Sequence, residues 1–218
     1  MEHRRFPLGP LWTNTYLVWH GAGGILVDPA GDISAVRSFA EGKGIAIEAI
    51  LLTHGHLDHV GGLPDALRCA VHGAFISEDD VPMVRTPDSG VRQWMGYDFE
   101  GTEECLPVRD GQRLSLGGME VQVLATPGHT PGSVCYLLSA GEDQLLLSGD
   151  TLFARSVGRT DLPGGSSESL EKSLLKLAAL PDGLPVLPGH GPETTIGSER
   201  EHNPFWPQGT TPEIPWKP

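Results

Sequence analysis

One short segment of the chain concentrates side chains that can hold metal ions. Residues 54–59 read His-Gly-His-Leu-Asp-His, so the segment carries His54, His56, Asp58 and His59. This pattern is expected by chance in roughly one chain in a thousand of such composition. Imidazole nitrogens suit zinc, iron and similar ions, and a carboxylate can bridge two cations while offsetting their charge. The segment therefore predicts a metal site.

Three further candidate ligands lie in glycine turns that follow apolar runs. His129 lies in a Pro-Gly-His-Thr-Pro-Gly turn, Asp150 in Ser-Gly-Asp-Thr, and His190 in Pro-Gly-His-Gly. Glycine permits sharp turns and close backbone approach, so a neighbouring side chain can be aimed at a fixed point. One such residue alone more often serves the turn itself. Several such elements in one chain reinforce each other and indicate a shared site.

These candidate ligands follow segments that read as β-strands. Residues 45–53 form an Ile- and Leu-rich run that is typical of a strand buried on both faces, and the histidine segment begins where it ends. Ligands collect at the carboxyl ends of strands in layered α/β proteins, so we expect the loops to meet. The strands expected before the other candidates are residues 119–125, 144–148 and 186–187.

Helices are expected between these strands. Residues 33–41 show apolar residues near helical spacing, with Gly42 as a plausible stop, and residues 166–180 carry a leucine stripe that Ser166 or Ser167 can cap. The remaining strands are expected at residues 11–19, 25–28 and 133–139. Such interleaving fits two sheets packed face to face with helices outside, and equally a single mixed sheet.

Length and charge restrict the class of protein. The 218 residues show no repeat and no linker, which predicts a single domain over residues 1–218 with an extended Pro-rich tail at residues 204–218. The net charge is −13, and no Lys- or Arg-rich run occurs. An acidic surface repels phosphate backbones, so we expect no nucleic-acid partner.

Cysteine usage and hydropathy point to the cytoplasm. The three cysteines, Cys69, Cys105 and Cys135, are odd in number and widely spaced, which fits reduced thiols rather than a disulfide framework. No secretory signal is recognisable at the N-terminus, and no stretch approaches 18 apolar residues. We therefore expect a cytoplasmic protein with no membrane partner.

Taken together in chain order, the motifs resemble those of the metallo-β-lactamase superfamily. The runs THGHLDHVGG, PGHT, GDTLF and PGHG span residues 53–191, and the opening LGPLWTNTYLV extends the resemblance over almost the whole chain. More narrowly, GRTDLPGG and PGHGPETTIGSEREHNPF are similar to short bacterial glyoxalase II-like proteins that lack a helical C-terminal domain. The resemblance implies an α/β fold, the four-layer αββα sandwich.

The resemblance also implies a role for each candidate. One ion would be held by His54, His56 and His129, a second by Asp58, His59 and His190, and Asp150 would bridge both. These two divalent ions would be zinc in the first place, with iron or a zinc–iron mixture as alternatives. Asp58 would also be catalytic by orienting a metal-bridging hydroxide. From its position in the GRTD loop just past Asp150, Arg159 is expected to orient ligands, to meet an anionic substrate or to form a structural pair with Asp161. The superfamily's lactamases carry a cysteine where this chain has Asp150, which counts against lactamase activity.

The expected function is a metal-dependent hydrolase, first of all a hydroxyacylglutathione hydrolase-like thioesterase acting on a small-molecule thioester. A thiolate leaves readily, so no strong general acid is required, and none is evident. A mononuclear-iron glutathione persulfide dioxygenase is the first alternative; it would need only His54, His129 and Asp150. A metallo-hydrolase of another bond, such as a lactone or phosphodiester, is the second.

Overall fold

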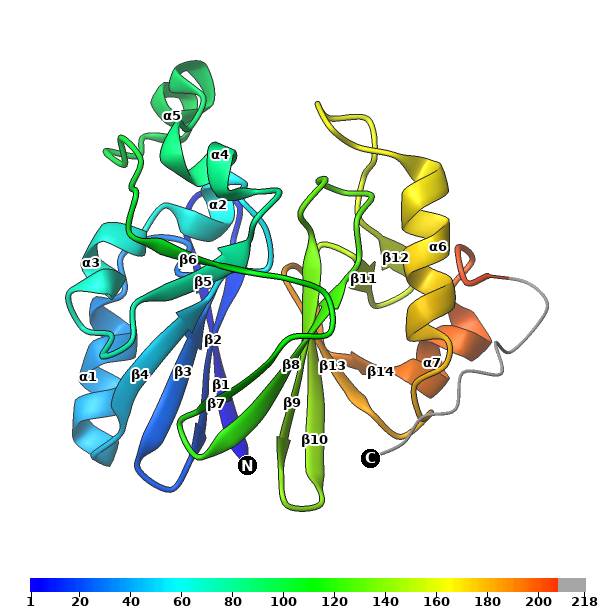
Figure 1. The fold of residues 1–218 in the computed structure, drawn as a ribbon, viewed down its shortest axis with the longest axis horizontal. Coiled ribbons are helices and arrows are strands. Elements are labelled where there is room, and N and C mark those ends of the chain that lie inside the picture. Colours follow the sequence, from blue (N-terminus) through cyan, green and yellow to red (C-terminus); the bar gives the residue numbers. More distant parts are fainter. Residues whose placement is uncertain (208–218) are drawn as a thin grey trace.

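Two six-stranded β-sheets face each other, and helices cover their outer faces (Figure 1). The computed structural model describes residues 1–207. The first sheet begins with an antiparallel meander, β1-β2-β3, and continues with parallel strands. Its members are β1 (Glu2–Leu8), β2 (Thr13–His20), β3 (Gly23–Val27), β4 (Ala46–Leu51), β5 (Ala74–Ser77) and β6 (Cys105–Val108).

The second sheet runs in the order β14-β13-β10-β9-β8-β7. Strands β7 to β10 are antiparallel, whereas β13 lies parallel to β10. Its members are β7 (Arg113–Leu116), β8 (Met119–Ala125), β9 (Val134–Ala140), β10 (Asp143–Gly149), β13 (Pro185–Pro188) and β14 (Thr194–Thr195). A separate small hairpin is formed by β11 (Leu152–Phe153) and β12 (Ser156–Val157).

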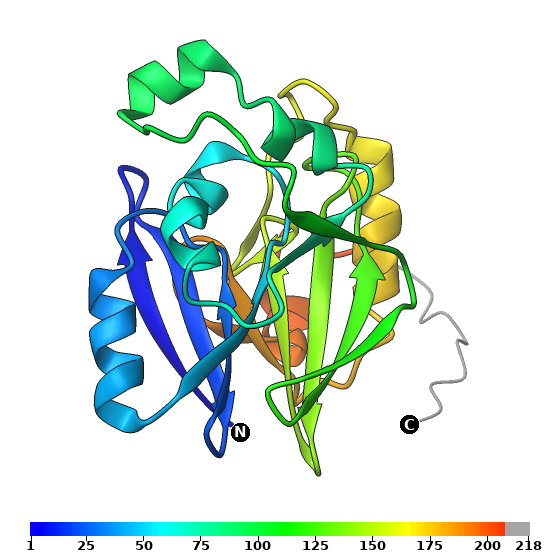
Figure 2. The ribbon, with the colours of Figure 1, turned by 60° about the vertical axis from the view of Figure 1, so that its left-hand side comes forward.

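Helices lie outside both sheets. Figures 1 and 2 show α1 and α3 beside the first sheet and α6 and α7 beside the second, while α4 and α5 project beyond the strand ends. The bounds are α1 (Ser34–Lys43), α2 (Leu57–Val60), α3 (Leu63–Leu67), α4 (Val81–Arg85), α5 (Ser89–Met95), α6 (Ser167–Leu177) and α7 (Ile196–His202).

Strand alternation sorts the apolar side chains into three cores. In β2, Leu17 faces the helices of the first sheet, whereas Tyr16 and Val18 face the space between the sheets. In β9, Tyr136 also faces that space, and Leu137 packs toward α6. Successive strand residues point to opposite faces, so each sheet is buried on both sides. The expected four-layer αββα sandwich is thereby confirmed, and the single mixed sheet is excluded.

Most expected elements occur within a few residues of their expected bounds. Helix α1 continues past Gly42 and ends at Gly44, whose φ of 69° provides the left-handed cap. Ser166 caps α6, because its side chain accepts a hydrogen bond from the amide of Ser169. Strand β1 has no counterpart among the expected strands, because its side chains are mostly polar and exposed.

The expected extended tail begins with a packed turn. Trp206 is buried against the outer core of the second sheet, and its amide donates to the carbonyl of Asn203. Residues 208–218 lie outside the described residues, so the tail remains a prediction there. Within residues 1–207, no helix combines the length and the apolar character that crossing a membrane requires.

Candidate metal centre

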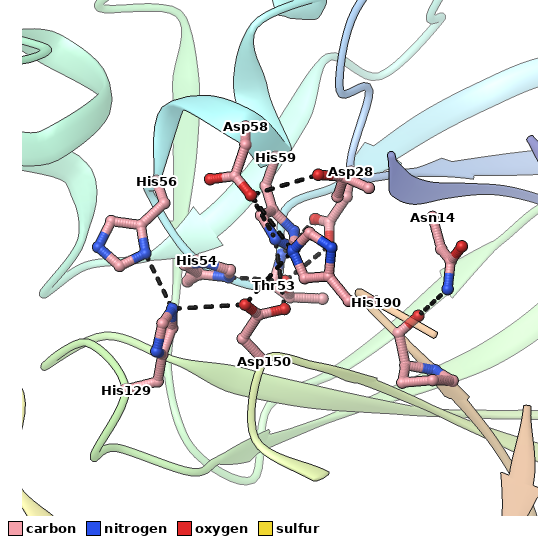
Figure 3. A network of polar contacts seen from close by, with 12 residues as sticks. Asn14, Asp28, Thr53, His54, His56, Asp58, His59, His129, Asp150 and His190 are labelled. Atoms are coloured by element: carbon pink, nitrogen blue, oxygen red, sulfur yellow. Dashed lines mark hydrogen bonds and ion pairs between the residues drawn. The ribbon is translucent and has the colours of Figure 1, made fainter. Parts of the chain in front are cut away.

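The seven predicted ligands converge between the two sheets, at the edge where four ligand-bearing loops meet (Figure 3). His54 and His56 lie in the loop after β4, while Asp58 and His59 lie in α2, which starts directly behind that loop. The other three ligands come from the second sheet, in the loops after β8, β10 and β13: His129, Asp150 and His190. The convergence expected from the strand ends is therefore present.

His54, His56 and His129 form the first ligand group. One ring nitrogen from each lies within 4.8 Å of those of the other two. His56 Nδ1 and His129 Nε2 are 2.9 Å apart, and the His54 ring stands nearly perpendicular to both of the other rings. Three nitrogen atoms at these separations can face one ion.

Asp58, His59 and His190 form the second ligand group. Asp58 Oδ2 lies 3.2 Å from His190 Nε2 and 3.5 Å from His59 Nε2. Asp150 lies between the groups, because its Oδ1 is 3.3 Å from His59 Nε2 while its Oδ2 is 3.6 Å from both His129 Nε2 and His190 Nε2. This is the placement that a carboxylate shared by two ions requires.

Several ligand atoms are buried without a hydrogen-bond partner. Within residues 1–207 they are His54 Nε2, His59 Nε2 and Asp150 Oδ1. A buried polar atom without a hydrogen-bond partner is costly, so atoms of this kind are suited to hold an ion. All three atoms belong to the two ligand groups or lie between them. The donor set, five imidazoles and two carboxylates, fits two borderline divalent ions.

Asp28 organises two of these histidines from behind, and sequence reasoning missed it. Its Oδ2 accepts hydrogen bonds from His59 Nδ1 at 2.9 Å and from Thr53 Oγ1 at 2.7 Å. Because the Thr53 hydroxyl proton is used there, its oxygen can accept from His54 Nδ1 at 3.1 Å. Both rings therefore carry their proton on Nδ1 and present Nε2 to the ions. The sequence signal that could have identified Asp28 is its place as a carboxylate directly after the apolar strand β3.

The polar surroundings set the charges of the ligands. Burial lowers the pKa of His54 well below its usual value and that of His56 to about 4, which keeps both imidazoles neutral. Burial opposes ionisation of Asp58 and Asp150, but the neighbouring histidines outweigh it and lower both pKa values. Burial also lowers the pKa of His59, but the adjacent carboxylates outweigh it and raise that pKa well above its usual value. A cation that binds His59 therefore displaces a proton.

Arg159 touches the ligand groups through its backbone. Its carbonyl accepts a hydrogen bond from His129 Nδ1 at 2.8 Å, which leaves His129 Nε2 for an ion. Its guanidinium is exposed and makes two hydrogen bonds to Asp161, at 2.7 and 2.8 Å. The structural pair with Asp161 is thus present, and the role of Arg159 in substrate binding stays a prediction.

Close approach explains two glycines around Asp150. A Cβ atom on Gly189 would overlap Asp150 Oδ1 and lie 2.6 Å from His59 Cε1, and one on Gly158 would overlap the Asp150 carbonyl. A side chain at Gly189 would displace the Asp150 carboxylate, and one at Gly158 would displace the Asp150 backbone. Cys135 is fully buried in the core outside the second sheet, where its thiol donates to the Ser148 carbonyl. Cys135 is therefore a core residue.

Comparison with known proteins agrees with this geometry. The sequence profile of the metallo-beta-lactamase superfamily matches residues 8–190. "Probable metallo-hydrolase YqgX" of Bacillus subtilis is 34% identical, over 94% of this chain and 97% of that protein. "Hydroxyacylglutathione hydrolase GloC" of Haemophilus influenzae is 33% identical, over 91% and 95%.

Two solved structures share the fold over nearly their whole length. BLEG-1, described as a B3 metallo-beta-lactamase, has a TM-score of 0.86 at 33% identity, with 95% of this chain and 100% of that chain covered. TTHA1623, described in a di-iron-bound form, has a TM-score of 0.82 at 38% identity, with 93% and 99% covered. The chain belongs to the metallo-β-lactamase superfamily.

Proposed function

We propose that this protein is a two-metal hydrolase that cleaves small-molecule thioesters. The observation that carries the proposal is the position of Asp150, whose carboxylate oxygens lie within 3.6 Å of histidines from both ligand groups. The thioester specificity is supported by the resemblance to glyoxalase II-like proteins and by a relative named hydroxyacylglutathione hydrolase. Zinc is the expected metal, and the di-iron form of TTHA1623 supports iron as the alternative.

When bound, two divalent ions in these groups would supply a water of lowered pKa and a Lewis acid for the substrate carbonyl. The protein's own contribution is to hold the ligands in place and to orient the attacking water. Asp58 is placed for that orientation. Its Oδ2 accepts a hydrogen bond from Thr13 Oγ1 at 3.2 Å and faces His190, so Oδ1 remains to accept a hydrogen bond from water. The lowered pKa of Asp58 keeps the carboxylate anionic for this role.

The oxygenase alternative predicts a different use of the same residues. A mononuclear iron site would employ His54, His129 and Asp150, and it would leave the second ligand group without a purpose. Because Asp58, His59 and His190 are all present and assembled, we favour the hydrolase. The BLEG-1 structure adds β-lactam hydrolysis as a reaction to be tested beside thioesters and lactones.

One set of assays tests the proposal. Protein purified without added metal is analysed for zinc and iron, then assayed with thioesters, lactones and a β-lactam, and separately with glutathione persulfide in an oxygen electrode. We expect up to two ions per chain, and thioester cleavage without oxygen uptake. Oxygen uptake without thioesterase activity would transfer the assignment to the dioxygenase. A protein that holds no transition metal even after reconstitution would contradict both.

A further inference from the structure

Asn14, at the start of β2, makes three hydrogen bonds to the loop that carries His190. Its amide nitrogen donates to the Gly189 carbonyl at 2.7 Å, and its side-chain Nδ2 donates to the carbonyls of Pro188 and Gly191, each at 2.9 Å. Carbonyls on both sides of His190 are therefore held from the opposite sheet by one buried residue.

The position of His190 depends more on its backbone contacts than the positions of the buried histidines do. Three of the other rings are each oriented by a hydrogen bond that Nδ1 donates to an oxygen atom behind the ring. His54 donates to Thr53 Oγ1, His59 to the Asp28 carboxylate and His129 to the Arg159 carbonyl. Within residues 1–207, the His190 ring makes polar contacts with Asp58 and Asp150 alone, and its side chain is 28% exposed. Its backbone is thus the part of it that is fixed.

Asp80, the residue before α4, holds the loops of the first ligand group by hydrogen bonds. Its Oδ2 accepts from the Gly55 amide at 2.9 Å and from Thr130 Oγ1 at 2.7 Å, and its Oδ1 accepts from the Gly132 amide at 2.7 Å. Gly55 stands between His54 and His56, and the other two residues follow His129.

Asp80 lies so close to Gly132 and Gly55 that a side chain at either glycine would contact it too closely. A Cβ atom on Gly132 would lie 2.6 Å from Asp80 Oδ1, and one on Gly55 would lie 3.1 Å from the Asp80 carbonyl. Asp80 itself is fully buried. One carboxylate therefore joins the two loops that supply the first ligand group, and it is not itself a ligand.

We propose that Asn14 and Asp80 are positioning residues, each dedicated to one metal site. Asn14 would set the second site through His190, and Asp80 would set the first site through the loops of His54, His56 and His129. The inference rests on the proposed two-metal function. It predicts that the two sites can be weakened separately by residues that touch no ion.

The experiment measures each site alone. Zn²⁺ affinity is determined by competition with a chromogenic chelator, in a His190→Ala background that retains the first group and in a His56→Ala background that retains the second. Asn14→Asp replaces the donating amide with an acceptor that faces two carbonyls, and Asp80→Asn replaces an acceptor with a donor that faces donors. Removing support behind a ligand typically costs about 10- to 100-fold in metal affinity. We expect that loss at the second site for Asn14→Asp and at the first for Asp80→Asn, with less than about threefold change at the other.

Asn203→Ala is the matched control. Asn203 is equally buried, and its amide donates to the Ser156 carbonyl and to Glu199 rather than to a ligand loop. This variant should lower the melting temperature and leave both affinities unchanged. Asn14→Ser and Asp80→Ser replace the isosteric variants if those fail to fold.

The outcomes separate the two proposals. A wild-type protein that binds fewer than two Zn²⁺ ions overturns the two-metal function, and this inference with it. Two ions in the wild type, with affinities that both variants weaken equally or leave unchanged, overturn the positioning roles alone. Site-selective losses in a protein without thioesterase activity would uphold the positioning roles and contradict the thioester assignment.

Discussion

The Oδ2 atom of Asp28 lies 2.9 Å from Nδ1 of His59, and both side chains are buried. Asp28 also accepts from the Thr53 amide at 2.8 Å, and it adopts a φ of 48° that aspartate and asparagine tolerate better than most residues. The carboxylate thus fixes the tautomer of one candidate ligand, His59, and the end of β4, after which His54 and His56 follow. Such a hydrogen bond raises the basicity of a ligating imidazole and fixes its orientation.

Replacing Asp28 should therefore weaken metal binding while the backbone is preserved. Asp28→Asn keeps the shape and the tolerance of positive φ, but it removes the charge that holds the proton on His59 Nδ1. We expect the affinity for the second Zn²⁺ to fall about 10- to 100-fold, and that for the first to fall less, because Asp28 reaches His54 only through Thr53. Chelator competition measures this, with the exposed Asp32→Asn as control. Unchanged Zn²⁺ affinity in Asp28→Asn would show that the orientation of the His59 ring does not depend on the Asp28 carboxylate.

Asp58→Asn tests the proposed role of that carboxylate in orienting the water. The amide keeps an oxygen ligand but loses the negative charge, so the second ion should bind more weakly and the water should be less well oriented. If the attack limits the rate, kcat should fall by two or more orders of magnitude, roughly the 3 kcal/mol that one preorganised electrostatic group contributes. The fold should persist, as thermal melting would show. Near-normal turnover, at full or single metal occupancy, would contradict the mechanism.

Asp150 and His190 should differ in their effect on metal content. Asp150 faces both ligand groups, so Asp150→Asn should lower the occupancy of both sites. His190→Ala should empty mainly the second. Elemental analysis after dialysis against a fixed zinc concentration distinguishes the two patterns, and Asp65→Asn, at an exposed carboxylate on α3, serves as control. Equal losses in Asp150→Asn and His190→Ala would argue against a shared ligand.

The three thiols should react in a defined order. Burial raises the pKa of Cys105 and of Cys135 to about 11. A raised pKa means less thiolate at pH 8, by roughly two orders of magnitude relative to a free cysteine of pKa ~8.5. In native protein at pH 8 we expect Cys69, which is partly exposed, to be alkylated first, then Cys105, and Cys135 only on unfolding. Raising the pH toward 11 should speed the reaction of Cys105. Peptide mapping by mass spectrometry reads the order, and early labelling of Cys135 would contradict its burial.

Much of the site could be predicted because its signals are local in sequence. His54, His56, Asp58 and His59 lie within one short segment, and His129 stands in a glycine turn after an apolar strand, as do the ligands that follow β10 and β13. Strand ends and glycine turns are short-range properties. The sequence alone therefore determined the candidate ligands, the order of the elements and the resemblance that implied four layers.

The tertiary structure decided which other residues serve the ligands. These residues, Asp28, Asn14 and Asp80, act through contacts with residues that are distant in the chain. Asn14 and Pro188, for example, are separated by 174 positions in the sequence. Arg159 contributes its carbonyl, which every residue type possesses, so its identity carries no signal of that role. Hydrogen bonds between distant backbone and side-chain atoms leave no periodic or compositional pattern. They are determined only when strands and loops pack together and bring these groups within about 3 Å of each other.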